Sequence, residues 1–276
     1  MPRKWGQHFL KHERYVHRMI KTAGIEPGES LLEIGPGMGM LTRHLLELAG
    51  GVTAVEIDEG LCQYLRERLT SYKFHLVFRD ILTYAPEDWN ALSPQPYKVI
   101  GNLAYNIASP LFFQLLPLRH HFQSLTFMVQ KEWAVRLCAQ PADGKEHAFL
   151  SVAATLGFDR QLAFLVPPQA FEPPPKVDSA VIHLVPRPCP PGLHDESAFL
   201  SWIQPLFEQR RKTLLNNAQR SYRQWYQSSQ SELQQTWGSR RAESLSLEEW
   251  LALYQQFRQS QSLSIKVTDK TMIQVP

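Results

Sequence analysis

The chain has 276 residues, of which 43% are hydrophobic and 20% are charged, and its formal net charge is +3. These fractions are ordinary for a folded globular protein and exclude a largely disordered one. No apolar run reaches the roughly 20 residues that span a bilayer, and the first residues lack the apolar core of a secretory signal. We therefore expect a cytoplasmic protein without a membrane partner. Cys62, Cys138 and Cys189 are far apart and form no Cys-x-x-Cys pair, which argues against a disulfide framework and against a zinc site.

Short apolar strands alternate with helices through most of the chain. A basic, partly helical arm over residues 1–25 comes first. The predicted strands are 30–34, 52–58, 74–78, 97–101, 125–129, 163–166 and 180–184. The predicted helices are 41–48, 61–69, 109–116 and 150–156. This alternation predicts an α/β fold with a parallel, doubly wound, Rossmann-like sheet. Residues 167–176 are rich in proline and are expected to form a stiff loop that joins neither a helix nor a sheet ladder.

The best candidate for a linker is the proline-rich stretch over residues 186–192. Beyond it, helix-forming residues predict a small all-helical second domain. We therefore expect a first domain over residues 1–188, a helical domain over 193–258, and a tail over 259–276 of uncertain structure. Within the tail, residues 264–267 are either an edge strand or flexible. Nothing in the sequence points to an oligomer, and a monomer is the default expectation.

Basic residues gather in two stretches of the sequence. Residues 3–21 contain six lysines and arginines against the single acid Glu13. Residues 209–230 contain no acid, and their basic residues are Arg210, Arg211, Lys212, Arg220 and Arg223. Two such patches fit a polyanionic partner, although each is also typical of a solvated helix face.

A glycine-rich turn follows the first predicted strand and precedes a helix. Its glycines are Gly35, Gly37 and Gly39. Glycines at this position let the backbone approach a ligand closely. The spacing differs from the dinucleotide fingerprint, whose third glycine comes five residues after the first. The turn therefore predicts a nucleotide-like cofactor without specifying which one.

Three acids accompany this turn. Glu33 comes just before it, Glu56 ends the second strand and suits the two hydroxyls of a ribose, and Asp80 follows the third strand and suits the amine of an adenine. Carboxylates repel a pyrophosphate but attract a cation. They favour S-adenosylmethionine (SAM), a nucleoside that carries an ammonium and a sulfonium group, and NAD remains the alternative.

The fourth strand leads directly into Asn102-Leu103-Ala104-Tyr105, at the sheet edge where ligands bind in open α/β folds. The amide oxygen of Asn102 and the carbonyl of Leu103 can accept the two protons of an adenine amine. Tyr105 and Phe171, the aromatic residue of the proline-rich loop, can stack on an extruded base. This set suits methylation of the amine, a poor nucleophile that has to be held in line with the methyl donor. The alternative is a strand-end asparagine that caps a turn, with Tyr105 as packing.

No metal ion or covalent nucleophile is needed for this reaction. We accordingly expect none of the ten histidines to be catalytic.

Seven segments of the sequence together resemble the KsgA family of small-subunit ribosomal RNA adenine dimethyltransferases. The resemblance extends from residue 3 to about residue 217. The segments are residues 6–10, 33–37, 56–58, 102–106, 129–132, 171–179 and 209–214.

The resemblance implies a reaction, a substrate and a set of contacts. The reaction is dimethylation by SAM of two adjacent adenosines near the 3′ end of 16S rRNA, within a late assembly intermediate of the small subunit. The implied cofactor contacts are His8, Leu10, Gly35, Glu56, Asp80 and Asn102. The implied contacts to the target base are Asn102, Leu103, Tyr105 and Phe171. The helical domain is expected to contact rRNA through Arg210, Arg211 and Lys212, although this run can equally stabilise a helix C-terminus.

Two residues depart from the family pattern. His8 stands where the family usually has asparagine, and a neutral imidazole still donates and accepts hydrogen bonds. Ala104 stands where the family usually has proline. Alanine at this position loosens the loop but leaves the Leu103 carbonyl in place. Two alternatives stay open. One is an Erm-type methyltransferase of large-subunit rRNA, whose members usually read Asn-Ile-Pro-Tyr and lack the Arg-Arg-Lys-Thr-Leu run. The other is an assembly factor that kept the fold without catalysis.

Overall fold

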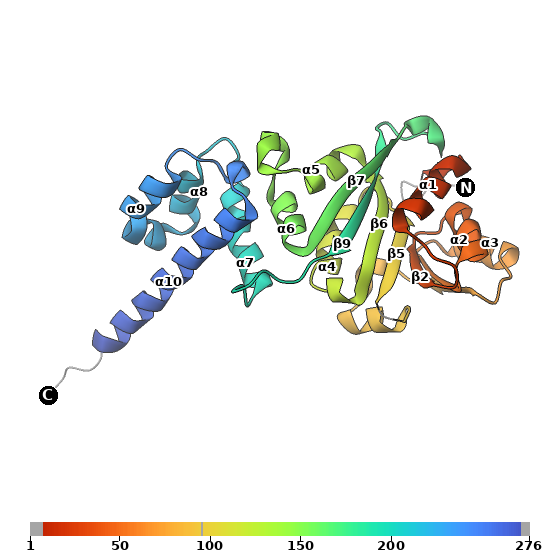
Figure 1. Cartoon of the computed structure of the whole chain (residues 1–276), viewed down its shortest axis with the longest axis horizontal. Coiled ribbons are helices and arrows are strands. Elements are labelled where there is room, and N and C mark those ends of the chain that lie inside the picture. The colour runs from red at the N-terminus through yellow and green to blue at the C-terminus, as the bar shows by residue number, and fades with distance from the viewer. Residues whose placement is uncertain (1–7, 95, 272–276) are drawn as a thin grey trace. The chain divides into compact units, whose positions relative to one another are not determined.

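The computed structural model describes residues 8–94 and 96–271, with side chains described as far as residue 261. Chain contacts divide the protein into two compact units (Figure 1). The sheet unit comprises Met1–Cys138 and Gly157–Pro188, and the helical unit comprises Ala139–Leu156 and Cys189–Pro276. Residues 1–7, which include the start of the basic arm and part of the family segment over residues 6–10, lie outside the described residues.

The sheet unit is built on a sheet of seven strands, which confirms the expected α/β class. In spatial order these are β4 (Phe74–Phe78), β3 (Gly51–Glu56), β2 (Ser30–Ile34), β5 (Tyr97–Asn102), β6 (Phe122–Gln130), β9 (Ser179–Pro186) and β7 (Phe158–Val166). The first five are parallel, whereas β9 runs antiparallel between β6 and β7. The segment between β7 and β9 contains no helix that could carry a parallel crossover, so these two strands pair antiparallel.

Helices pack on both faces of this sheet. They are α1 (Glu13–Ala23), α2 (Met40–Leu48), α3 (Glu59–Arg68), α4 (Ala108–Leu115) and α5 (Lys131–Cys138). Val16 and Met19 of α1 are fully buried and share one apolar cluster with Leu45 of α2 and Ile100 of β5. Helical spacing of apolar residues thus anchors the helical part of the basic arm to the sheet.

The strand order reverses between β2 and β5. From β2 the chain continues outward to β3 and β4, and it then returns to start β5 on the other side of β2. The two neighbouring strands approach closely, because a Cβ on Gly101 would lie 2.5 Å from the carbonyl oxygen of Ile34. The carboxyl ends of both strands therefore meet at one point, with the glycine turn after β2 and Asn102 at the end of β5.

The proline-rich loop forms a short ladder, which makes the expectation of a loop without sheet pairing wrong. β8 (Phe171–Glu172) pairs antiparallel with β1 (Phe9–Leu10), and the N–H of Lys11 donates to the carbonyl of Ala170 at 2.9 Å. The ladder is possible because its two residues precede the run of prolines and retain their N–H groups.

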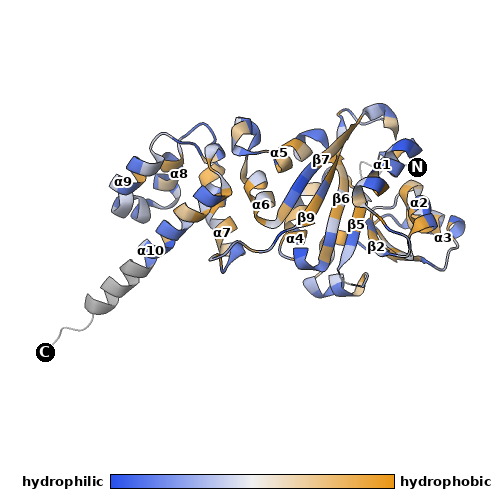
Figure 2. Ribbon diagram, viewed as in Figure 1, coloured by the Kyte–Doolittle hydropathy of each residue, from blue (hydrophilic) through white to orange (hydrophobic). Residues whose placement is uncertain are grey.

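The helical unit contains α6 (Phe149–Gly157, of which the last residue belongs to the sheet unit), α7 (Glu196–Ile203), α8 (Leu214–Ser221), α9 (Arg223–Trp237) and α10 (Leu247–Thr271). Its core is strongly aromatic and includes buried Trp202, Trp225, Trp237 and Trp250. Val152 and Leu156 of α6 belong to the same core. Hydrophobic and hydrophilic stretches alternate along α10 (Figure 2), as expected when one side of a helix faces a core.

Residues 264–267 of the tail are helical, as part of α10, and not an edge strand. Within residues 8–94 and 96–271, none of the helices combines the length and the apolar character that crossing a membrane requires.

We predict that Gly101→Ala destabilises the sheet unit by about 1–3 kcal/mol, because the new methyl group overlaps backbone that cannot move aside. In urea unfolding, a lower midpoint concentration of urea at an unchanged slope of the unfolding free energy against urea concentration would show this destabilisation. The matched control is Gly60→Ala in α3, where the methyl group would meet the movable Asp58 carboxylate at 3.3 Å. An unchanged midpoint for Gly101→Ala would show that β2 and β5 can separate without cost.

Candidate active site

A cavity of about 470 Å³ lies in the sheet unit at the carboxyl ends of its parallel strands. The structure brings together there the nine residues that the family resemblance implies as contacts of the cofactor or the target base, together with Gly37 of the predicted cofactor turn. They are His8, Leu10, Gly35, Gly37, Glu56, Asp80, Asn102, Leu103, Tyr105 and Phe171. Their proximity follows from the strand reversal, since residues distant in sequence end at one edge of the sheet.

The turn after β2 follows a path that glycine makes possible. Gly35, Gly37 and Gly39 have φ values of 69°, 57° and 78°, a region that other residues rarely adopt. A Cβ on Gly37 would also lie 3.2 Å from the ring of Phe9. The turn thus passes directly under the N-terminal strand β1, and backbone rather than side chain faces the cavity.

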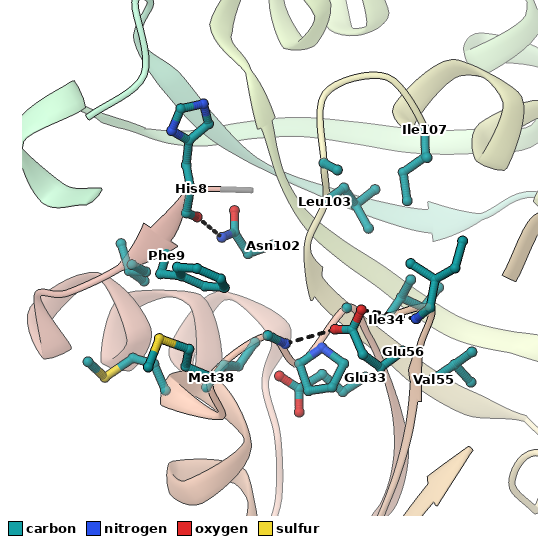
Figure 3. A pocket seen from close by; sticks show the side chains of 18 of the residues that line it. His8, Phe9, Glu33, Ile34, Met38, Val55, Glu56, Asn102, Leu103 and Ile107 are labelled. Carbon is teal, nitrogen blue, oxygen red and sulfur yellow. Dashed lines mark hydrogen bonds between the residues drawn. The ribbon is translucent and has the colours of Figure 1, made fainter. Parts of the chain in front are cut away.

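Glu56 at the end of β3 is held by three backbone donors. Its carboxylate accepts hydrogen bonds from the N–H groups of Gly37 (3.1 Å) and Ile57 (2.9 Å) (Figure 3), and from that of Asp58 (3.0 Å). Burial raises the pKa of Glu56, and the backbone donors oppose this rise because they favour the carboxylate. The side chain is therefore fixed in one orientation at the cavity wall.

Glu33 in β2 is also buried, but fewer hydrogen bonds offset the cost of burying its carboxyl group than at Glu56. Only 1% of its surface is exposed, and burial raises its pKa to about 8. Thr42 is the polar neighbour that opposes this rise, and the Glu56 carboxylate adds to it. Among the described residues, neither Oε2 of Glu33 nor Oγ1 of Thr42 has a hydrogen-bond partner at good geometry. A buried carboxyl oxygen thus stands at the cavity ready for a donor or a cation.

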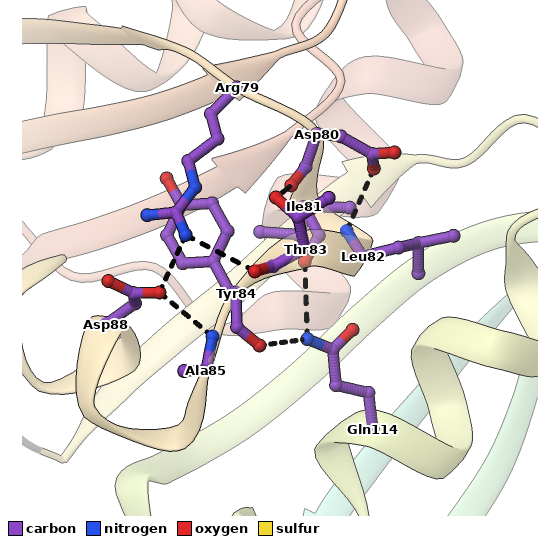
Figure 4. A network of polar contacts seen from close by, with 9 residues as sticks. All are labelled: Arg79, Asp80, Ile81, Leu82, Thr83, Tyr84, Ala85, Asp88 and Gln114. Carbon is purple, nitrogen blue, oxygen red and sulfur yellow. Dashed lines mark hydrogen bonds and ion pairs between the residues drawn. The ribbon is translucent and has the colours of Figure 1, made fainter.

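Asp80 follows β4 and is positioned by its own loop. Its Oδ1 accepts from the N–H of Leu82 at 2.9 Å. Gln114 of α4 donates to two carbonyls of the loop, at 3.3 and 2.9 Å, and Arg79 pairs with Asp88 at 2.8 Å (Figure 4). These contacts tie the loop to α4, so that Asp80 stays at the cavity.

The orientation of the Asn102 amide is decided by one hydrogen bond. Its Nδ2 donates to the backbone carbonyl of His8 at 3.2 Å (Figure 3). A carbonyl can only accept, so the nitrogen has to face His8, and Oδ1 has no partner among the described residues. The N–H of Leu103 donates to Met128 at 3.0 Å, and the Leu103 carbonyl likewise meets no donor within the described chain. Two neighbouring acceptors are thereby available at the end of β5.

His8 contacts both the proline-rich loop and the Asn102–Tyr105 segment. Its Nδ1 lies 2.8 Å from the carbonyl of Pro173, so Nδ1 carries the proton. Its ring centroid is 5.8 Å from that of Tyr105. The imidazole that replaces the usual asparagine therefore links β1 to the loop, while the backbone of the same residue holds Asn102.

The two predicted stacking rings differ in exposure. The Tyr105 hydroxyl lies 2.9 Å from Oγ of Ser179, and its ring is half-buried at the cavity. Burial raises the pKa of Tyr105, and the bond to Ser179 opposes the rise. Phe171 lines the same cavity but is only 1% exposed, because it packs into the core beside α1.

The basic run of the helical unit lies between a 3₁₀ turn (Gln204–Phe207) and α8. Arg210 is engaged within the protein, since it donates to the carbonyl of Lys145 and pairs with Glu243 at 3.7 Å. Arg211 and Lys212 are exposed and have no partner in the described part of the chain. Only these two basic side chains of the run are therefore available to an external anion.

Sequence reasoning missed several residues of the cavity. Phe9 covers Gly37, and Met38 remains 48% exposed at the cavity wall. Gly101, which permits the close approach of β2 and β5, gave no local signal beyond its place before Asn102. Over residues 8–94 and 96–271, no group of three or more His, Cys, Asp or Glu side chains is arranged to hold a metal ion.

We predict that Glu33→Gln stabilises the protein more at pH 8–9 than at pH 5. The unfolded chain loses the Glu33 proton near the ordinary pKa of 4.5, whereas burial raises the pKa of Glu33 in the folded protein to about 8. The folded state therefore binds more protons across this window, and its stability falls as pH rises. The gain at high pH should be on the order of a few kcal/mol. Urea unfolding at several pH values measures it, with exposed Glu26→Gln as the control. A gain independent of pH would contradict the prediction.

The chain matches a protein family over almost its whole length. The profile of the family described as ribosomal RNA adenine dimethylase matches residues 2–259. The chain is 41% identical over 258 residues to ribosomal RNA small subunit methyltransferase A of Prosthecochloris aestuarii, covering 93% of this chain and 94% of the relative. It is 40% identical over 270 residues to the protein of the same name from Thermosynechococcus vestitus, covering 94% and 97%.

Two solved structures agree with this relationship. The dimethyladenosine transferase from Plasmodium falciparum has a TM-score of 0.72 at 24% identity, covers 91% of this chain and 98% of its own, and shows the likeness of fold alone. The 23S rRNA methyltransferase ErmE has a TM-score of 0.65 at 28% identity and covers 90% and 98%. From the family profile and the relatives together, the chain belongs to the ribosomal RNA adenine dimethylase family.

Proposed function

We propose that the protein uses SAM to dimethylate two adjacent adenosines near the 3′ end of small-subunit rRNA. Membership of the dimethylase family supports the reaction. The relatives whose names specify the small subunit favour this substrate over the 23S rRNA in the name of ErmE. The observation that carries the proposal is the Asn102 amide, whose nitrogen is engaged by His8 so that its oxygen is left to accept. An assembly factor without catalysis would not need this arrangement.

The residues of the cavity fit SAM. The turn at Gly37 leaves no room for a side chain, the Glu56 carboxylate is fixed by backbone donors, and Glu33 keeps a buried oxygen without a partner. Two buried acids suit hydroxyls and an ammonium group and disfavour the pyrophosphate of NAD. We assign the cofactor contacts to His8, Leu10, Gly35, Gly37, Glu56, Asp80 and Asn102. When bound, SAM supplies an electrophilic methyl group.

The chain's own contribution is to hold the adenine amine. Oδ1 of Asn102 and the Leu103 carbonyl would each accept one of its two protons. Acceptors on both protons favour a nitrogen that rehybridises, so that its lone pair is no longer delocalised into the ring. Fixing this nitrogen in line with the methyl group removes much of the entropic barrier. No side chain has to remove a proton before the attack.

Stacking by aromatic residues completes the proposed base site. Tyr105 presents a half-buried ring held by Ser179, which makes it the first stacking face. Phe171 is buried in the core, so it would supply the second face only after the β1–β8 ladder shifts.

We extend the proposal to the setting of the reaction. The enzyme would act as a cytoplasmic monomer on an assembly intermediate of the small subunit during ribosome biogenesis. Of the predicted RNA-binding residues, exposed Arg211 and Lys212 would contact rRNA directly, and Arg210 would stabilise the loop that presents them.

Small subunits that lack the modification test the proposed function. They would be incubated with the full-length protein and methyl-labelled SAM, and the rRNA would be digested and analysed by mass. We expect dimethyladenosine near the 3′ end. Transfer to large-subunit rRNA alone would support an Erm-type enzyme, and SAM binding without any transfer would support an assembly factor.

Asn102→Ala should lower the turnover number by about 100-fold or more, because one of the two acceptors on the amine is lost. Binding to the small subunit, measured by filter retention, should change by less than about twofold, since the contact concerns one base. Exposed Asn216→Ala in α8 serves as the control and should leave both quantities unchanged. Full activity of Asn102→Ala would remove Asn102 from the proposed mechanism.

Ala104→Pro should keep or raise the turnover number. No N–H bond is lost, because among the described residues the Ala104 N–H has no acceptor, and its carbonyl still accepts from Ile107 at 3.1 Å. Proline should also stabilise the protein by about 0.5–1 kcal/mol through the unfolded state. Thermal unfolding and initial rates measure both effects. A large loss of activity would show that this backbone differs from the family pattern.

A further inference from the structure

A second hollow, of about 550 Å³, lies entirely within the helical unit. It forms where the end of α8 and the start of α9 meet α10. We call it the aromatic–arginine groove and define it by Tyr222, Arg223, Gln224, Phe257 and Arg258. It is separate from the cavity of the sheet unit and plays no part in the reaction described above.

The aromatic side of the groove is held rigid. The hydroxyl of Tyr222 donates to the carbonyl of Trp202 at 2.8 Å, which fixes the ring at the junction of α8 and α9. The centroids of Tyr222 and Phe257 are 5.4 Å apart, and Phe257 also packs edge-on against Trp225 at 5.4 Å. Tyr222 and Phe257 are only half-buried, so two fixed rings remain accessible from solvent.

The charged side of the groove is uniformly positive. Arg223 is exposed and has no partner in the described part of the chain, and Arg258 extends from α10. None of the described residues that line the groove is acidic. Arg220 near the end of α8 differs from Arg223, because it pairs with Glu208 at 3.2 Å. The charge at Arg223 thus faces solvent uncompensated, which suits an anionic partner.

The exposed guanidinium of Arg223, the amide of Gln224 and the accessible aromatic rings together match the chemistry of an unpaired nucleotide. Guanidinium groups bind phosphate, and aromatic rings stack on bases whatever their sequence. We propose that the aromatic–arginine groove binds an unpaired nucleotide of small-subunit rRNA, with its phosphate at Arg223 and its base on Tyr222 and Phe257. This inference rests on the proposed function, because it takes the substrate to be rRNA.

The groove would form a contact distinct from that of Arg211 and Lys212. Those residues precede α8, whereas the groove lies at its other end. The eight residues of α8 separate the two sites by about 12 Å. Two contacts at the ends of one rigid helix would orient the helical unit on the RNA better than either contact alone.

Arg223→Gln in the full-length protein tests the phosphate contact. The dissociation constant for unmodified small subunits should rise about five- to tenfold, and the slope of its logarithm against that of salt should fall by about one. The turnover number at saturating subunits should stay unchanged, because the groove is outside the catalytic machinery. Arg220→Gln removes the same charge at a site outside the groove and should change binding by less than about twofold.

Ultraviolet cross-linking tests the base contact without relying on activity. Complexes with small subunits would be irradiated, digested and searched for nucleotides attached to peptides that contain Tyr222 or Phe257. We expect a cross-link to rRNA there, lost in Tyr222→Leu and retained in Tyr222→Phe, which keeps the ring. Circular dichroism would show that each variant is folded.

The outcomes separate the two proposals. Equal binding by Arg223→Gln and Arg220→Gln, together with no rRNA cross-link in the groove, would overturn the groove while methylation continues. A cross-link from the groove to a ribosomal protein would also overturn it, in favour of a protein partner. Absence of methylation by the wild-type protein would instead overturn the proposed function.

Discussion

The close approach of β2 and β5 is the constraint on which the site depends. The two strands are adjacent although they are far apart in sequence, and the approach requires glycine at position 101 because the Ile34 carbonyl occupies the space of a side chain. Their ends place the glycine turn beside Asn102. A cofactor at the turn and an amine at Asn102, as proposed, would thereby meet at one point, which is the preorganisation that methyl transfer needs.

Two buried acids at this point show different solutions to the cost of burying a carboxyl group. Glu56 receives three backbone N–H bonds, whereas Glu33 has an oxygen with no partner among the described residues and a pKa raised to about 8. Such an uncompensated acid reduces stability at neutral pH, and it suits a site that gains a cationic ligand. Stability and binding are in this respect opposed, as is common where function requires a buried polar group.

The N-terminal segment and the proline-rich loop jointly orient the amide at the end of β5. β1 pairs with β8, the His8 ring donates to Pro173, and the His8 carbonyl accepts from Asn102. Replacing the family's usual asparagine by histidine therefore affects more than one cofactor contact, because the same residue joins three segments. The replacement of the usual proline by Ala104 has a more local effect, since the hydrogen bonds of the neighbouring backbone do not involve the Ala104 N–H.

The sequence by itself determined the strands of the α/β sheet and most of its helices, though not α5, because periodicity is a local property. Strand-end position is local too, and it determined the glycine turn, the acids at strand ends and the Asn102–Tyr105 segment. The family resemblance added the cofactor and the substrate. Only the tertiary structure decided that β9 runs antiparallel between β6 and β7, that Phe171 is buried, that Arg210 is engaged by Glu243, and that Val152 and Leu156 pack with the helical core. Each of these depends on contacts between residues remote in the chain, which no local pattern encodes.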